Sequence, residues 1–281
     1  MFGRKGLDVK TPDQIRRMRV AGVVVGQTLE LIRGRANAGV TTGELDRAAE
    51  EFIRSNGATP SFLGYHGFTG SLCVSVNEEV VHGIPGPRTL RDGDLVSVDC
   101  GAIVDGWHGD AAISLIVGGR EAGSARDCAL MDATEASLWA GIAALAVGSP
   151  LFDVGAAVED CIVDAARADG VTYGIVEDYV GHGIGTEMHQ DPQVPNYRVR
   201  DRGPILRSGV TVAIEPMVTA GSAETDVLDD EWTVVTQDGS RAAHWEQSVA
   251  VTDAGIWVLT ALDGGQERLG ALGATYAPLL L

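Results

Sequence analysis

LVSVDCGAIVDGWHGD, residues 95–110, is the stretch of sequence that most strongly determines the fold. Leu95, Val96 and Val98 give its first part the apolar character of a buried strand. Asp105-Gly106 then supplies the residues that a two-residue hairpin turn prefers. The stretch therefore predicts two antiparallel strands joined by a tight turn.

The predicted hairpin brings two carboxylates onto one face of the sheet. With a two-residue turn, residue 101 faces Asp110 and Asp99 faces residue 112, whereas a longer loop would change this pairing. Asp99 and Asp110 are then diagonal neighbours about 7 Å apart, and their side chains can converge. A buried carboxylate is costly unless a cation pairs with it, and no Lys or Arg lies between Asp92 and Val117. A metal ion is therefore the expected partner.

Two pairs of helices are predicted, one in each half of the chain. The first pair consists of a helix that begins at the capping box Thr11–Gln14 and ends by Gly39, and a helix that begins at Thr41. The apolar stretch Leu138–Ala146 and the helical spacing over Val154–Ala165 predict the second pair. Strand-like sequence follows each pair, at Leu72–Val76 and Leu95–Val98, and again at Val210–Ile214 and Ser248–Val251.

The second half contributes further polar residues that do not resemble surface groups. Glu215 ends an apolar strand, Glu246 precedes another, and His182 lies among glycines. With Asp99 and Asp110 they make an oxygen-rich set of four carboxylates and one imidazole. Such a set favours two hard or borderline ions such as Mn²⁺, Fe²⁺ or Co²⁺ over structural zinc. Two bridging carboxylates could hold ions about 3.5–4 Å apart, which is an arrangement typical of hydrolases.

These patterns predict a duplicated helix-helix-sheet unit of the mixed α/β (α+β) class, with the site at the junction of the halves. We expect a single catalytic domain over residues 1–281, with its core at about 11–262. The halves are expected at about 11–118 and 133–262, and a short C-terminal tail without an assigned function at 263–281.

Composition and charge limit the partners and the compartment. The chain is 45% hydrophobic, and its formal net charge of −18 argues against nucleic acid and anionic membranes as partners. No apolar run approaches the roughly 20 residues of a membrane span, and no apolar signal core follows the first residues. A cytoplasmic protein is expected. Its cysteines match no zinc or disulfide pattern, so we expect reduced, mostly buried thiols at 73, 100, 128 and 161.

Six motifs in sequence order are together highly specific, although each alone would be weak. They are GYHG at 64–67, NEEVVHGIP at 77–85, Asp99 with Asp110, GHGIG at 181–185, IEPM at 214–217 and Glu246. On these residues the chain, from about Thr11 to Leu262, resembles the type I methionine aminopeptidases of the pita-bread fold. The resemblance implies a metal-dependent enzyme that removes the initiator methionine of nascent proteins and favours a small uncharged second residue.

The resemblance also implies a set of metal ligands. Asp99, Asp110, His182, Glu215 and Glu246 would hold two divalent ions, with Asp110 and Glu246 shared between them. Co, Mn, Fe, Zn and Ni all stay open as the metal used in the cell.

Substrate-binding residues follow from the same resemblance. His82 would lie near the scissile nitrogen, and His189 would contact the scissile carbonyl. The methionine pocket would be formed by Tyr65, Phe68, Cys73 and Trp232, with Phe62 and Met188 at its edge. The expected partner is the N-terminal Met of nascent polypeptides, the expected state is a monomer, and contact with the ribosome stays open.

Three positions depart from the family pattern, and two other functions compete. Phe68 stands where Tyr is common, Met188 where Phe is common and Gln247 where His is common, which bears on fine specificity. Proline-specific aminopeptidases and prolidases share the fold and metals, but they usually carry a large extra N-terminal domain, and the 81 residues before His82 disfavour them. A metal-free binding protein is disfavoured because all five ligand positions are filled.

Overall fold

The computed structural model describes residues 7–279, so the first six and last two residues of the predicted domain lie outside the described residues. The helices are α1 (Pro12–Arg35), α2 (Thr42–Ser55), α3 (Ala125–Ala143), α4 (Asp153–Asp169) and α5 (Gln266–Ala271), with 3-10 turns at Tyr65–Gly67 and Arg120–Ala122. The strands are β1 (Thr59–Pro60), β2 (Leu72–Val76), β3 (Glu79–Val81), β4 (Leu95–Val104), β5 (Trp107–Ile116), β6 (Gly174–Ile175), β7 (Gly181–Gly183), β8 (Gln190–Val194), β9 (Val210–Ile214), β10 (Met217–Thr219), β11 (Thr225–Val227), β12 (Val234–Thr236), β13 (Ala242–His244), β14 (Glu246–Thr252) and β15 (Gly255–Val258).

The first two helices begin at the predicted capping residues. The Thr11 hydroxyl accepts a hydrogen bond from the Gln14 N–H, and the Gln14 side chain accepts one from the Thr11 N–H. Thr41 caps α2 in the same reciprocal way. However, α1 ends at Arg35, a turn before Gly39, which instead lies in a turn with a φ of 91°.

The first helix of the second half is longer than predicted. It begins at Ala125 instead of near Leu138, because Ser124 caps it by accepting a hydrogen bond from the Asp127 N–H. Polar residues in its first turns interrupt the apolar pattern on which the prediction relied. Residues far along the chain hold these polar turns, since Arg241 pairs with Asp127 and Arg126 donates to the carbonyl oxygen of Ala220. The predicted Val154–Ala165 helix lies wholly within α4.

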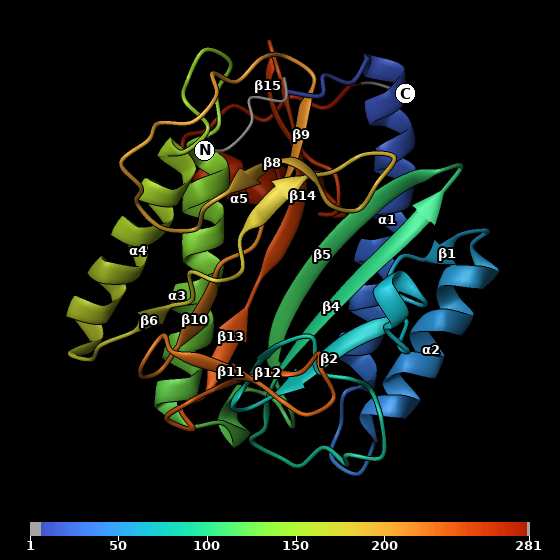
Figure 1. Ribbon diagram of the computed structural model, residues 1–281, viewed down its shortest axis with the longest axis vertical. Coiled ribbons are helices and arrows are strands. Elements are labelled where there is room, and N and C mark those ends of the chain that lie inside the picture. The colour runs from blue at the N-terminus through green and yellow to red at the C-terminus, as the bar shows by residue number, and fades with distance from the viewer. Residues whose placement is uncertain (1–6, 280–281) are drawn as a thin grey trace.

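The strands of the two halves join into one curved sheet. Its nine strands follow the order β1-β4-β5-β14-β9-β7-β8, with β2 also pairing with β4 and β15 with β14. The halves meet where β5 pairs with β14, as a duplicated unit predicts. In Figure 1, α1 and α2 (blue) lie by the β4–β5 half and α3 and α4 (green) by the other half. Two small sheets, β13-β10-β6 and β11-β12-β3, extend the structure.

The hairpin of β4 and β5 has the predicted register. Gly101 pairs with Asp110, and Asp99 pairs with Ala112. Asp105 and Gly106 have φ angles of 49° and 79°, the left-handed pair that a type I′ turn requires. The prediction of two convergent carboxylates on this hairpin therefore had the correct geometric basis.

Two further expectations concern membranes and thiols. Among the described residues, no helix is long and apolar enough to cross a membrane. All four cysteines are free thiols. Cys73 and Cys100 are buried, but Cys128 and Cys161 are half-buried, because each lies on a helix that is open to solvent on one side.

Candidate functional site

Five neighbouring strands each bring one predicted metal ligand to the same region of the sheet. Across the order β4-β5-β14-β9-β7, the residues are Asp99, Asp110, Glu246, Glu215 and His182. Asp99 and Glu246 lie in one row, since both pair in register with Ala112. Glu215 directly follows β9, and His182 on β7 pairs with Ala213 of that strand. The sheet thus places the predicted ligands side by side.

Short distances connect the five side chains. Ligand atoms of Asp110, His182 and Glu246 all lie within 4.8 Å of one another. Nε2 of His182 is 3.4 Å from Oε1 of Glu215 and 4.0 Å from Oε1 of Glu246. Besides burial, the negative charge of Asp99 raises the pKa of Asp110, as expected of neighbouring carboxyl groups.

None of the lysines and arginines within residues 7–279 pairs with these carboxylates. Asp110, Glu215 and Glu246 are at most 9% exposed, and no Lys or Arg lines the cavity around them. Within the described part of the chain, Oδ1 of Asp99, Oδ1 of Asp110 and Oε1 of Glu246 are buried without a hydrogen-bond partner. Burial raises the pKa of Asp99 to about 7 and raises the pKa of the other three carboxyl groups well above their usual range. Ionised carboxylates that are buried without a counter-charge destabilise the fold, and a bound cation would remove this cost.

His182 presents a lone pair to these carboxylates. Its Nδ1 lies 3.0 Å from the carbonyl oxygen of Gly183, which can only accept a hydrogen bond, so Nδ1 must carry the proton. Burial lowers the pKa of His182 to about 3, which keeps the ring neutral and leaves Nε2 free to bind a metal. The donor set of carboxylate oxygens and one imidazole nitrogen therefore fits divalent metal ions.

An apolar pocket adjoins the carboxylates within the same cavity of about 450 Å³. The side chains of Phe62, Phe68, Cys73 and Met188 are buried in one cluster, and Trp232 packs against it. The rings of Phe68 and Trp232 meet edge to face, with centroids 5.0 Å apart. All of the residues predicted for the methionine pocket, Tyr65 included, line this cavity.

His82 is held between aromatic rings at the cavity wall. Its ring meets those of Tyr179 and Trp232 edge to face at 5.4 and 6.0 Å, and its backbone adopts a φ of 60°. A positive φ is uncommon outside glycine and is often found at functional sites. Burial lowers the pKa of His82 to about 4, so its imidazole is neutral near pH 7.

His189 lines the same cavity and lies next to His182. The two imidazole rings are 4.3 Å apart. Nδ1 of His189 is 2.8 Å from the hydroxyl oxygen of Tyr65. Burial also lowers the pKa of His189, so this hydrogen bond fixes the orientation of a neutral ring.

The remaining histidines lie at or beyond the edge of this site. His66 lines the cavity at an exposed position. His108 lies 3.0 Å from the Ser61 hydroxyl, and His244 is fully buried; neither lines the cavity.

Sequence reasoning missed three residues that shape the site. Tyr179 packs on His82, and Ile84 packs against the apolar pocket, although both stand within or beside motifs already identified. Asn196 is fully buried and exchanges two hydrogen bonds with the backbone of Glu215. A lone Asn gives no sequence signal for such a role, because the contact joins residues from separate strands and loops.

Known proteins resemble this chain over nearly its whole length. The model of metallopeptidase family M24 matches residues 16–253. The chain is 52% identical over 259 residues to methionine aminopeptidase 1 of Mycobacterium tuberculosis, covering 92% of this chain and 96% of that protein. It superposes on the methionine aminopeptidase of Thermotoga maritima with a TM-score of 0.84 and 40% identity, covering 91% and 99% of the two chains. These similarities confirm the pita-bread fold.

A prolidase of Pyrococcus furiosus shares only the fold. Its TM-score is 0.67 and its identity 18%, over 90% of this chain and 65% of that chain.

Proposed function

The chain belongs to metallopeptidase family M24, among its methionine aminopeptidases, and on this premise we propose that it removes the initiator methionine of nascent proteins when the second residue is small and uncharged. The observation that carries the proposal is the cluster of uncompensated buried carboxylates beside an apolar pocket. One half of the cavity suits metal ions and the other suits an unbranched apolar side chain.

We assign the metal centre to Asp99, Asp110, His182, Glu215 and Glu246. Two divalent ions would be held there, with Asp110 and Glu246 shared as the family resemblance implies. Strands β5 and β14 pair, and ligand atoms of both carboxylates lie within 4.8 Å of each other and of His182. The oxygen-rich donor set favours Mn²⁺, Fe²⁺ or Co²⁺. Zn²⁺ and Ni²⁺ are the other candidate ions. Such ions would supply Lewis acidity towards the scissile carbonyl and towards water.

His82 and His189 are proposed to act on the substrate and not on the metal. His82 is neutral, so its imidazole can share a proton at the scissile nitrogen. His189, oriented by Tyr65, can donate a hydrogen bond from Nε2 to the scissile carbonyl oxygen if Tyr65 donates to Nδ1. The two rings line the same cavity as the carboxylates, so both are placed to reach a bound peptide bond.

The substrate methionine would fill the pocket of Phe68, Cys73 and Trp232. Tyr65 would form its wall, and Phe62 and Met188 its edge. An apolar pocket separates neighbouring side chains by about 1–3 kcal/mol per methylene, so norleucine should be partly accepted and charged side chains excluded. His82 and the metal face would crowd the second residue, which is why a small one is favoured.

Peptide assays and metal analysis test this proposal. We expect cleavage of Met-Gly, Met-Ala and Met-Ser peptides and poor cleavage of Met-Leu and Met-Phe peptides. Comparable rates on Met-Ala-Ser and Met-Phe-Ser would refute the preference for a small second residue. Cleavage of Gly-Pro in place of Met-Gly would instead indicate a proline-specific enzyme. Mass spectrometry of the purified protein should find two metal ions per chain.

Location and assembly belong to the same proposal. Because initiator methionine is removed from chains emerging during synthesis, we propose that the protein works in the cytoplasm as a monomer. No nucleic acid or membrane partner is expected at a net charge of −18. Cell fractionation, light scattering and co-sedimentation with ribosomes would test the compartment, the monomer and a ribosome contact.

A further inference from the structure

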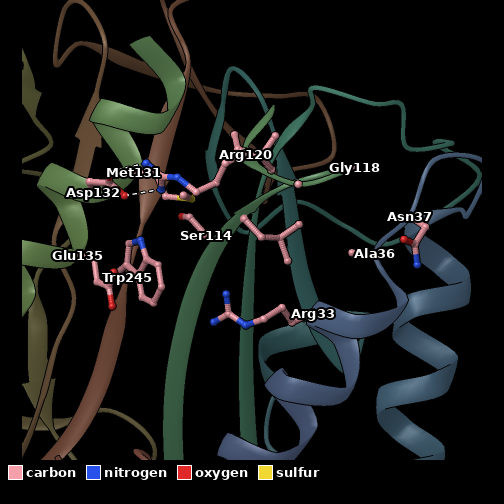
Figure 2. Close-up of a pocket in the computed structure, with 13 residues that line it drawn as sticks. Arg33, Ala36, Asn37, Ser114, Gly118, Arg120, Met131, Asp132, Glu135 and Trp245 are labelled. Atoms are coloured by element: carbon pink, nitrogen blue, oxygen red, sulfur yellow. Dashed lines mark hydrogen bonds and ion pairs between the residues drawn. The ribbon is translucent and has the colours of Figure 1, made fainter. Parts of the chain in front are cut away.

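A second cavity lies between α1 and α3, on the helix-covered side of the sheet. Its volume is about 510 Å³, a size that suits a small organic ligand. None of its lining residues lines the candidate active site. The two cavities are nevertheless neighbours in sequence, because Trp245 lines one and Glu246 lines the other. Figure 2 shows Arg33, Trp245 and Glu135 reaching into the second cavity from different elements.

A buried hydrogen-bond donor is unused in this cavity. Trp245 is 7% exposed, and its indole Nε1 is buried without a hydrogen-bond partner among the described residues. Leaving such a donor unpaired costs about 1–3 kcal/mol, so a buried indole N–H normally has a partner. A ligand with a hydrogen-bond acceptor would satisfy it.

A second donor group faces the same indole. The guanidinium of Arg33 on α1 lies 6.0 Å from the centre of the Trp245 ring and points towards it in Figure 2. Its ion pair is a single contact of 3.3 Å between Nε and the exposed Glu30. An exposed pair of this kind holds an arginine weakly, so the guanidinium can serve an anion in the cavity.

The carboxylate side chains that line the cavity are already paired with arginines. Both carboxylate oxygens of Asp132 accept hydrogen bonds from Arg120, at 2.7 and 2.6 Å, and Glu135 pairs with Arg268. The Ser114 hydroxyl donates to the carbonyl oxygen of His244 and accepts a hydrogen bond from the His244 N–H. The cavity therefore offers a cation and an indole donor, and a ligand must bring the acceptor.

The remaining wall is apolar. Leu115 and Ile116 of β5 and Met131 of α3 line the cavity and are at most 8% exposed. We propose that this cavity binds a small carboxylate with an apolar body, whose oxygens meet Trp245 Nε1 and Arg33 while its body packs on these side chains. A hydrogen bond between a carboxylate and an arginine is charge-assisted and therefore stronger than one between neutral groups.

Indole resonances test this proposal in the metal-loaded protein. Among the five tryptophans, Trp245 reports on the second cavity and Trp232 on the methionine pocket. Hydrocinnamate is titrated into ¹⁵N-tryptophan-labelled protein, with Trp245→Phe used to identify the signal. We expect a saturable shift of the Trp245 signal and none of the Trp232 signal. The uncharged amide of hydrocinnamate should bind at least about tenfold more weakly, because charged hydrogen bonds are the stronger ones.

Two arginine variants on α1 make a matched pair. Arg33→Gln should weaken hydrocinnamate binding at least about tenfold, whereas Arg35→Gln, which does not line the cavity, should leave it unchanged. Equal affinities for the two variants would overturn the proposal. So would a shift of the Trp232 signal alone, which would place the ligand in the active site, or equal binding of hydrocinnamate and its amide.

Discussion

At the scale of single residues, Asp110 is a proposed metal ligand whose loss should affect both ions. It is 3% exposed, and its neighbours include the carboxyl group of Asp99 and the imidazole of His182. As a ligand shared by both ions it should be required for both. Residues that only support metal ligands cost about 10–100-fold in affinity or activity when removed, so Asp110→Ala should lower activity by more than about a hundredfold.

Metal content and circular dichroism check this prediction. The variant should lose metal but keep its fold, while Asp229→Ala, in an exposed loop, should match the unaltered protein. Wild-type turnover of the Asp110 variant with metal bound would refute the assignment.

Substitutions of His82 and His189 should reduce the catalytic rate without reducing metal binding. His82→Ala and His189→Ala should each lower kcat by about 10²–10⁴-fold with little change in metal content. Tyr65→Phe removes only the hydroxyl 2.8 Å from His189 Nδ1, so it should lower kcat less than His189→Ala does. Steady-state kinetics alongside metal analysis distinguishes these outcomes. Loss of metal from the His82 variant would count against its proposed role.

At the scale of elements, close contact between α1 and the strands beneath it holds β5 in place. A Cβ on Gly109 would lie 2.8 Å from the backbone nitrogen of Gly22, and a Cβ on Gly22 would lie 2.1 Å from the carbonyl oxygen of Leu259. The absence of side chains at these glycines lets the helix press on the strand that carries Asp110.

Two glycines of α1 therefore should respond in opposite ways to the same substitution. Gly22→Ala should destabilise the protein by at least about 1–3 kcal/mol, because a backbone atom fills the space. Gly34→Ala, which meets nothing within 4 Å, should stabilise it by about 0.5–1 kcal/mol through helix propensity. Thermal unfolding measures both changes. A Tm that falls equally in the two variants would contradict the packing argument.

At the scale of the whole molecule, metal binding should depend on pH. The pKa of Asp99 rises from 3.8 to about 7 on folding, so the folded metal-free protein binds protons more tightly than the unfolded chain does. Its stability should therefore fall as pH rises through this window, whereas bound metal replaces the protons. The gain in Tm on adding Mn²⁺ should thus increase from about pH 5 to about pH 7.

Comparison of loaded and chelated protein at each pH isolates this effect. The buried histidines 82 and 244, whose pKa values are lowered to about 4 and about 3, destabilise both forms on acidification, so their contribution largely cancels. An equal gain in Tm across the range would show that protons and metal do not compete at these carboxylates.

Sequence alone determined the features that depend on neighbouring residues. The capping boxes of α1 and α2 and the Asp105-Gly106 turn are local, so their residues are sufficient to predict them. This two-residue turn sets which residues of β4 and β5 face each other. It therefore also brings the side chains of Asp99 and Asp110 close together. The apolar or glycine-rich surroundings of Glu215, Glu246 and His182 marked them as candidates, but only the family resemblance assigned them to the same metal centre as the hairpin.

Only the tertiary structure decided how the distant elements meet. It places β14 between β5 and β9, which brings Glu246 between Asp110 and Glu215, and it joins Tyr65 to His189. It also opens the cavity behind Trp245. The physical reason is that these contacts depend on pairing and packing between segments far apart in the chain, whose free energy is gained only when the whole sheet and its helices assemble.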